Sequence, residues 1–277
     1  MPRRISVLPN RRPLIVTRPA REAAQWVGQL EARGWAAQAL PLIDIAPGPD
    51  RPALLQAWQT LAHFDALMFV SSNAVEQFFA ARPADMPVLA DAAKPRWWVT
   101  GPGSQAALLA QGVPASAIDQ PPAHATQLDS EALWAQVQSQ VRPGMRVLIV
   151  RGTVAGVGAG VHGPGHGQGR DWLGAQLVQA GAQLQWVVAY TRSAPVWDAA
   201  RRDQVAQALA QEAVWLWSSS EALANLCAAF PGQNWQGAAA VATHPRIAQA
   251  AREAGFGRVA LAGPGLDALC ASIESLA

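Results

Sequence analysis

Two hydroxyl-rich turns are the places in this sequence where side chains suited to chemistry are grouped. SSN at 71–73 comes directly after the apolar run DALMFV, and SSS at 218–220 comes directly after VWLW. Serine is a good helix N-cap, so each turn could do no more than start the helix that follows. Hydroxyls beside the unpaired N–H groups of a helix start can also bind anions. Both explanations stay open for any single serine.

Arginines take a similar position after two other apolar runs. Arg18 follows LIVT and Arg151 follows VLIV, and Lys94 is the only lysine in the chain. An anion site in this protein would therefore use guanidinium groups, whose planar fork of donors suits carboxylates. Salt bridges on the surface are the alternative role for both arginines.

The apolar runs before these polar groups are predicted to be buried strands of a parallel sheet. Continuous apolar runs are typical of strands that helices cover on both faces. Between them lie segments with helical spacing, such as 20–34, where Ala23, Trp26 and Leu30 share a face and Gly34 ends the helix. This alternation predicts an α/β fold with right-handed crossovers. The predicted strands are 14–18, 65–70, 97–100, 146–150, 184–190, 214–217, 238–242 and 258–262.

The sequence also repeats itself. LIVTRP, a helix and ARGWAAQALPLIDIAP resemble VLIVRG, a helix and QAGAQLQWVVAYTRSAP. FVSSNAVEQF resembles LWSSSEALANL, and VTGPGSQAALLAQG resembles ATHPRIAQAAREAG, so Gly34 corresponds to Gly181 and Gly112 to Gly255. Blocks in the same order predict two copies of one α/β unit. The polar turns then lie at the carboxyl ends of equivalent strands, where open parallel sheets bind ligands. Two such edges facing each other would form a shared cleft.

Composition argues against several classes of protein. With 277 residues, 51% of them apolar and 14% charged, the chain is predicted to be globular and long enough for two domains. The net charge is +2, and no basic face with interleaved aromatic residues indicates a nucleic-acid partner. No segment resembles a signal peptide or a membrane span. Cys227 and Cys270 form no disulfide framework and the histidines are scattered. We therefore expect a reduced, cytoplasmic protein without a metal site.

A glycine-rich tract at 153–169 needs a separate interpretation. It contains GAGVHG, a formal match to the dinucleotide-binding pattern G-x-G-x-x-G. That pattern requires its glycines tightly between a strand and a helix, whereas the strand here is predicted to end near Arg151, several residues too early. The first repeat also lacks the tract. We expect a flexible surface insertion in which His162 and His166 are solvated.

Taken in order, the motifs resemble those of the uroporphyrinogen-III synthase family. The resemblance rests on LIVTRP, PLIDIAP, FDALMFVSSNAVEQF, VTGPGSQAAL, VLIVRG, VVAYTRSAP, WSSSEAL and ATHPRIAQAAREAG. It implies two similar flavodoxin-like parallel-sheet α/β domains, joined by a two-stranded antiparallel ladder, with a cleft between them. The implied domains are 1–40 plus 196–277 for domain 1 and 48–188 for domain 2, with linker strands at 41–47 and 189–195.

The resemblance also implies a reaction. The enzyme would cyclise hydroxymethylbilane to uroporphyrinogen III, with inversion of ring D through a spiro intermediate and loss of water, in tetrapyrrole biosynthesis. No cofactor or metal is implied, and we expect a monomer. Tyr190 is the only tyrosine and matches a tyrosine of the family. A phenol is protonated at neutral pH, so Tyr190 could donate to the leaving hydroxyl. Packing against the ladder is its alternative role.

The remaining site residues are expected to bind the many carboxylates of the bilane. Backbone N–H groups, hydroxyls and arginines would donate hydrogen bonds to carboxylates at many points of the substrate. One departure from the family affects this set. Many members carry threonine one or two places after the proline of the last block, whereas this chain has Arg246 and Ile247 after Pro245. The expected substrate-binding residues are Arg18, Ser71, Ser72, Asn73, Thr100, Gly101, Arg151, Arg192, Ser218, Ser219, Ser220, Thr243 and Arg246.

Two other functions are kept as alternatives. The chain could be a non-catalytic two-domain protein that binds a small anion, although such proteins usually carry an export signal. It could also be a nucleotide-dependent enzyme that uses GAGVHG.

Overall fold

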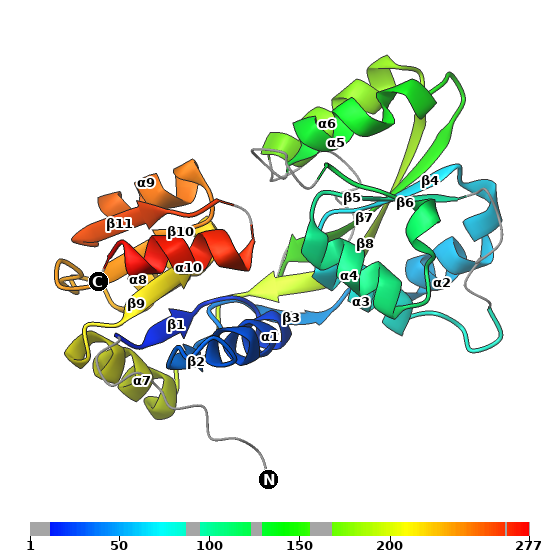
Figure 1. Ribbon diagram of the computed structural model, residues 1–277. Helices are drawn as coiled ribbons and strands as arrows, with labels where there is room; N and C mark the ends of the chain where they lie inside the picture. The colour runs from blue at the N-terminus through cyan, green and yellow to red at the C-terminus, as the bar shows by residue number, and fades with distance from the viewer. Residues whose placement is uncertain (1–11, 87–94, 123–128, 156–167, 264, 277) are drawn as a thin grey trace, which may run out of the picture. The chain divides into compact units, whose positions relative to one another are not determined.

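The chain folds as two compact units, each built around a parallel sheet of its own (Figure 1). The computed structural model describes residues 12–86, 95–122, 129–155, 168–263 and 265–276. Unit 1 combines Met1–Asp44 with Ser193–Ala277, and unit 2 is Ile45–Arg192. The first strand and helix of the chain therefore share a unit with its last third.

Unit 1 has a five-stranded sheet in the order β2-β1-β9-β10-β11, and every neighbouring pair in it is parallel. Its strands are β1 (Leu14–Val16), β2 (Ala37–Ala39), β9 (Val214–Trp217), β10 (Ala239–Ala242) and β11 (Arg258–Leu261). Its helices are α1 (Ala20–Glu31), α7 (Ala199–Ala210), α8 (Ser220–Ala229), α9 (Pro245–Glu253) and α10 (Leu266–Glu274).

The core of unit 1 has a layer on each face of this sheet. Val214 and Leu216 pack with residues of α1 and α10 in one buried cluster. Trp215 and Trp217 alternate with them along β9 and so point to the opposite face. There Trp215 makes edge contacts with Trp235 and Phe256. Each face of a parallel strand is thus covered by apolar side chains, which explains the continuous apolar run VWLW.

Unit 2 has a six-stranded sheet in the order β3-β8-β7-β4-β5-β6. Its strands are β3 (Asp44–Pro47), β4 (Ala66–Phe69), β5 (Arg96–Val99), β6 (Ile118–Asp119), β7 (Arg146–Val154) and β8 (Gln183–Ser193). Its helices are α2 (Arg51–Gln59), α3 (Ser72–Ala80), α4 (Pro102–Ala110), α5 (Ser130–Val137) and α6 (Gln168–Gln179), with short 3-10 turns at Leu61–His63, Ala115–Ala117 and Gln138–Gln140.

Helices cover both faces of the unit 2 sheet (Figure 1). Leu67 and Phe69 of β4 belong to a buried cluster with residues of α2, α3 and α4. Ala66 and Met68, which alternate with them, belong to a second cluster with residues of α5 and α6. The helices of the second layer, α5 and α6, pack side by side. We call these the α3 face and the α6 face of the sheet.

The two units share one strand order. The order β2-β1-β9-β10-β11 of unit 1 is the flavodoxin-like order 2-1-3-4-5. In unit 2 the strands β8-β7-β4-β5-β6 form the same arrangement in space, but there the pair β7 and β8 comes last along the chain. The glycines paired by the sequence repeat also share a backbone conformation, with φ of +81° at Gly34, +86° at Gly181, +86° at Gly112 and +95° at Gly255. The prediction of two similar parallel-sheet α/β units is therefore confirmed.

Several predicted boundaries were wrong. The strand expected to end near Arg151 continues to Val154, because β7 stays paired with β8 as far as Arg192. β3 lies beside β8, so the end of β8 has a strand on each side. The short strands β2 and β6 were not among the predicted ones. Most of the glycine-rich tract, at 156–167 and including GAGVHG, lies outside the described residues.

Candidate active site

Neighbouring strands bring the predicted polar residues to one edge of each sheet. In unit 2, β4 and β7 are parallel neighbours, so Ser71 and Arg151 stand at the same carboxyl-end edge. In unit 1, β9 and β1 are parallel neighbours, so Ser218 and Arg18 do the same. From one strand of each pair the chain continues to the next strand on one side of the sheet, and from the other strand it continues to the opposite side. Open α/β sheets bind ligands at such a topological switch point.

Tyr190 lies on β8 beside this edge of unit 2. Its side chain is 3% exposed and belongs to the buried cluster on the α3 face. Its phenolic Oη lies 3.0 Å from Ser71 Oγ, and either hydroxyl can donate. A Cβ built on Gly152 would lie 2.3 Å from Tyr190 Cζ. The ring therefore lies directly over the Gly152 backbone, where only glycine leaves room for it.

A bulge in β8 sets the direction of this side chain. Arg151 pairs with Val188 and Gly152 pairs with Tyr190, so Ala189 is an extra residue on β8 at this register shift. In a regular strand Ala189 and Tyr190 would point to opposite faces. Both belong instead to the cluster on the α3 face. Bulges commonly re-aim a side chain in this way, and this one turns the phenol toward Ser71.

Ser71 makes two hydrogen bonds with other described residues. It is the N-cap of α3, and its Oγ accepts a hydrogen bond from the Ala74 N–H at 3.2 Å. The same oxygen contacts the phenol of Tyr190. The capping role is therefore right for this serine, but it is not the whole role. Ser72 and Asn73 follow as half-buried residues in the first turn of α3.

Of the two arginines expected on this side, Arg151 lies on the other face of the sheet from the phenol. The Arg151 guanidinium lies 4.9 Å from the ring centroid of Trp186, and Trp186 packs against the cluster on the α6 face. Arg151 and Tyr190 therefore point to opposite faces of the sheet. Arg192 is half-buried and pairs with Val154 near the end of β8.

Equivalent helices of the two units begin differently. Gly101, which follows the half-buried Thr100, is the N-cap of α4, and among the described residues no side chain caps that helix. In unit 1 the N-cap of α9 is His244, whose Nδ1 accepts from the Arg246 N–H at 3.1 Å. The Arg246 side chain itself is exposed.

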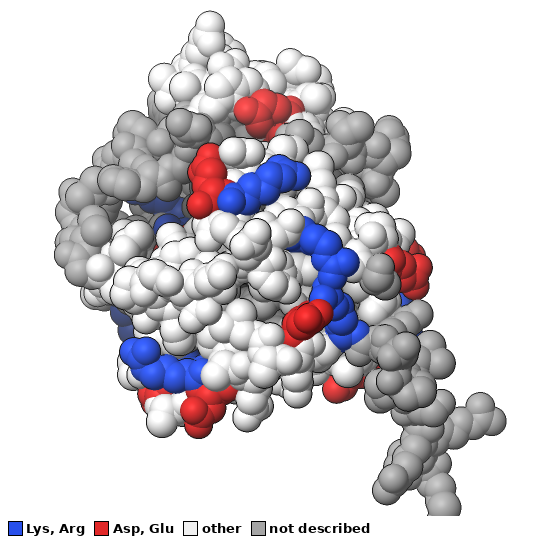
Figure 2. All heavy atoms as spheres, turned by 90° about the vertical axis from the view of Figure 1, so that its left-hand side faces the viewer, with Lys and Arg blue, Asp and Glu red and all other residues white. Residues whose placement is uncertain are grey.

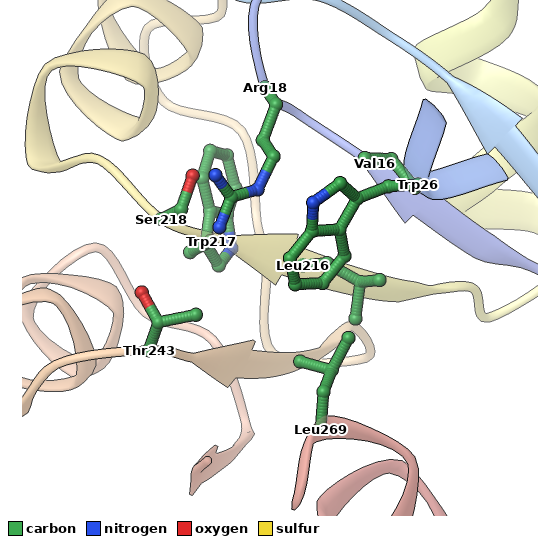
Figure 3. A pocket seen from close by; sticks show the side chains of 8 residues that line it. All are labelled: Val16, Arg18, Trp26, Leu216, Trp217, Ser218, Thr243 and Leu269. Atoms are coloured by element: carbon green, nitrogen blue, oxygen red, sulfur yellow. The ribbon is translucent and has the colours of Figure 1, made fainter. Parts of the chain in front are cut away.

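In unit 1, Arg18, Ser218 and Thr243 line one shallow hollow at the carboxyl-end edge (Figure 3). The hollow has a volume of about 200 Å³, open solvent included. Figure 3 shows the Arg18 guanidinium extending between the Ser218 hydroxyl and the Trp26 ring. The other lining residues are Val16, Trp26, Leu216, Trp217 and Leu269.

Arg18 is held in place by two contacts. Its Nη1 donates to Glu22 Oε2 at 2.9 Å, one helical turn along the chain, and its guanidinium carbon lies 4.2 Å from the Trp26 ring centroid. Both charged side chains are only about one-fifth exposed, at 22% and 20%. A guanidinium carries five N–H donors. Glu22 is its one carboxylate partner in the part of the chain that the structure describes, which leaves donors for a second anion.

The serines that start α8 in unit 1 are arranged differently from those in unit 2. Ser219 caps the helix, and its Oγ accepts from the N–H groups of Glu221 and Ala222 at 3.2 and 3.4 Å. Ser220 Oγ and Trp217 Nε1 are both buried without a hydrogen-bond partner among the described residues. Ser218 is therefore the serine of this turn that faces the hollow, as Figure 3 shows.

The surroundings of Cys227 and Cys270 do not activate either thiol as a nucleophile. Burial raises the pKa of the Cys227 thiol and of the Cys270 thiol above the ordinary value. The thiolate is the nucleophilic form, and a raised pKa makes it scarcer at neutral pH. Within the described ranges, no cluster of three or more His, Cys, Asp or Glu side chains could hold a metal ion.

The structure thus groups the predicted residues into two sets. It brings together Ser71 and Tyr190 in unit 2, and Arg18, Ser218 and Thr243 in unit 1. Sequence reasoning missed Gly152, which lies beneath the Tyr190 ring, and Trp26, which stacks on Arg18. It also missed Trp186, which stacks on Arg151 outside the two sets. A signal existed for Trp26, because Arg18, Glu22 and Trp26 recur every fourth residue, which is helical spacing. None existed for Gly152, because its role depends on the bulge in the neighbouring strand.

Residues 24–271 match the family described as Uroporphyrinogen-III synthase HemD. The uroporphyrinogen-III synthase of Salmonella typhimurium is 30% identical over 193 residues, which cover 68% of this chain and 68% of that protein. Two solved structures share the fold. The uroporphyrinogen-III synthetase of Helicobacter pylori has a TM-score of 0.58 at 14% identity, covering 96% of this chain and all of that one. A mutant uroporphyrinogen III synthase of Thermus thermophilus has a TM-score of 0.52 at 15% identity, covering 95% and 98%.

No described helix is both long and apolar enough to cross a membrane. The family match spans both units, and Ser71 and Ser218 follow β4 and β9, which hold equivalent places in the two sheets. The chain belongs to the uroporphyrinogen-III synthase family.

Proposed function

We propose that the chain cyclises hydroxymethylbilane to uroporphyrinogen III, with inversion of ring D and loss of water, in tetrapyrrole biosynthesis. The observation that carries this proposal is membership of the family over residues 24–271, nearly the whole described chain. The site chemistry agrees with it, because phenol, hydroxyls and guanidinium groups suit a substrate that combines a leaving hydroxyl with many carboxylates.

Tyr190 is the proposed acid. The bilane loses its terminal hydroxyl as water, and this departure requires a proton. The phenol supplies that proton, and the proton released from the substrate when the ring closes restores the phenol. The Ser71 contact at 3.0 Å and the Gly152 backbone beneath the ring support this role, because they hold the hydroxyl in one direction. The remainder of the rate acceleration is assigned to positioning, because the enzyme holds the two ends of the bilane together.

The carboxylates of the bilane are assigned to the other predicted residues. Arg18 is the strongest of these sites, because Ser218 and Thr243 line the same hollow. A charge-assisted hydrogen bond contributes about 1.5–3 kcal/mol, so a few such contacts suffice for a flexible substrate. The further proposed contacts are Ser72, Asn73, Thr100, Gly101, Arg151, Arg192, Ser219, Ser220 and Arg246.

The organisation of the molecule is proposed with the same function. Domain 1 is 1–40 plus 196–277, domain 2 is 48–188, and 41–47 and 189–195 are the linkers. The division into Met1–Asp44 with Ser193–Ala277 and Ile45–Arg192 supports this arrangement. We propose that the enzyme acts as a cytoplasmic monomer on its small-molecule substrate, and that the reaction needs no cofactor and no nucleic-acid partner.

Isomer analysis tests the activity. Freshly made hydroxymethylbilane closes by itself to the symmetrical type I ring, so the enzyme is detected by the isomer it yields. Purified protein is incubated with the bilane, the products are oxidised to porphyrins, and the isomers are separated by chromatography. We expect type III product without any added cofactor. Only type I product, at the rate of the buffer control, would overturn the proposal.

A further inference from the structure

We infer that Ser71 and Gly152 are positioning residues for Tyr190, which together fix the direction in which its phenol donates a proton. This inference rests on the proposed function for its catalytic consequence, and on the geometry of unit 2 alone for the arrangement itself. It changes the role of Ser71, which was expected to bind substrate directly.

The hydrogen bonds of Ser71 determine which way the phenol proton points. Ser71 Oγ already accepts from the Ala74 N–H at 3.2 Å. A hydroxyl has a single proton to donate, and Tyr190 Oη lies 3.0 Å away. When Ser71 donates to Oη, the phenol accepts that bond and its own proton is turned away from Ser71. The phenol is then free to donate to a bound substrate.

The same bond stabilises the product of proton donation. Once Tyr190 has given up its proton, the phenolate oxygen accepts a charge-assisted hydrogen bond from Ser71, which is stronger than the neutral one. Ser71 is also the N-cap of α3, and the start of a helix carries a partial positive charge that favours a nearby anion. Ser71 therefore acts most strongly when negative charge develops on the phenol, as catalysis requires.

Gly152 and the bulge fix the ring. The bulge at Ala189 turns Tyr190 to the α3 face, and the ring then lies over Gly152, where a Cβ would come within 2.3 Å of Cζ and 2.5 Å of Cε2. The ring is 3% exposed, so it has little room to swing away. The backbone of Gly152 fixes the position of the Tyr190 ring, and the hydrogen bond with Ser71 fixes the position of its hydroxyl oxygen.

Rates of type III formation test the role of Ser71. We expect Ser71→Ala to lower kcat about tenfold with KM unchanged, and Ser71→Thr, which keeps the hydroxyl and the cap, to restore most of the rate. In a Tyr190→Phe background, Ser71→Ala should cause no further loss, because the bond it removes is already gone. Asp129→Ala is the matched control, since Asp129 caps α5 of the same unit through an equivalent bond to the Ala132 N–H at 2.9 Å. It should leave kcat unchanged.

A spectroscopic measurement tests the arrangement without activity. Tyr190 is the only tyrosine, so protein labelled with ¹³Cζ-tyrosine gives a single resonance whose chemical shift reports the hydrogen bond of the phenol. Ser71→Ala should move this resonance, and Ser71→Thr and Asp129→Ala should leave it near its original position.

The outcomes separate the two proposals. Independent, additive losses from Ser71→Ala and Tyr190→Phe, or a raised KM, would make Ser71 a substrate contact and overturn the inference. A resonance that Ser71→Ala does not move would also overturn it. Failure of the wild-type protein to form type III product would overturn the proposed function instead, while the resonance would still decide whether Ser71 holds the phenol.

Discussion

Removing the hydroxyl of Tyr190 separates a catalytic role of this residue from a role in stabilising the fold. Tyr190→Phe keeps the ring over Gly152 and removes the hydroxyl that contacts Ser71. We expect the rate of type III formation to fall about 10²–10⁴-fold, the usual contribution of a general acid. Stability should fall by only about 1 kcal/mol, the net worth of one hydrogen bond. Stopped assays give the rate and urea unfolding gives the stability. An unchanged rate would remove the acid role from Tyr190.

Arg18 offers a second test at the scale of one residue. Arg18→Lys keeps the positive charge but loses the fork of donors and the stacking on Trp26. We expect KM to rise about tenfold, which corresponds to ~1.4 kcal/mol, with kcat nearly unchanged. Substrate dependence of the initial rate measures both.

The matched control is Arg33→Lys. Arg33 lies just after α1 and pairs with Asp267 at 3.0 Å, with side chains 41% and 93% exposed. Exposed pairs of this kind contribute little, so neither KM nor stability should change appreciably. Equal effects of the two substitutions would show that Arg18 has no special contact with the bilane.

At the scale of the elements, the paired strands β7 and β8 carry the clearest prediction. Gly152→Ala places a methyl group within 2.3 Å of the Tyr190 ring, so the ring must move. We expect a loss of about 1–3 kcal/mol in the free energy of unfolding, the usual cost of overpacking, together with a reduced kcat. Denaturant unfolding and the type III assay measure the two effects.

Gly28→Ala is the control for that substitution. Gly28 lies inside α1, and a Cβ there would meet nothing within 4 Å. Alanine is favoured over glycine in a helix by about 0.5–1 kcal/mol, so this variant should be slightly more stable and fully active. Wild-type activity in Gly152→Ala would mean that the ring tolerates displacement.

The elements also show what the sequence can and cannot predict. The strand 214–217 was predicted at its observed limits, and 65–70 differs from β4 by one residue at each end, because buried parallel strands are continuously apolar. β7 was cut short at Arg151 because Gly152 and Thr153 end the apolar run, although pairing with β8 continues to Val154. Strand pairing depends on residues distant in sequence, and a local pattern does not contain it.

In the candidate site, too, local sequence predicts which residues come together better than it predicts where their side chains point. Arg18, Ser218 and Thr243 were expected in the site because each follows the carboxyl end of a predicted strand, and they line one hollow. The direction of a side chain is harder to predict. Arg151 and Tyr190 were both placed in the site, yet they point to opposite faces of their sheet because the bulge at Ala189 shifts the alternation of β8. One inserted residue moves each later side chain of the strand to the opposite face of the sheet. The local sequence AYT at 189–191 does not indicate such a bulge.

At the scale of the whole molecule, the glycine-rich tract can be tested by removal. Deleting residues 155–168 takes out GAGVHG and joins the end of β7 to the start of α6. We expect type III formation to continue at nearly the wild-type rate, because every residue proposed for the site lies outside this segment. Isomer analysis of the deleted protein measures it. Loss of activity in a protein that keeps its circular dichroism spectrum would favour a role for the tract, and binding of a nucleotide by the intact chain would favour the dinucleotide interpretation.

The stacked arginines have a consequence for the entropy of binding. Arg18 and Arg151 occupy equivalent places in the two units and each lies over an indole ring, with Trp26 coming from α1 and Trp186 from β8. An arginine that is free in solvent loses rotamer freedom when it binds an anion. Each ring already restricts its guanidinium, so less freedom is left to lose when a carboxylate binds.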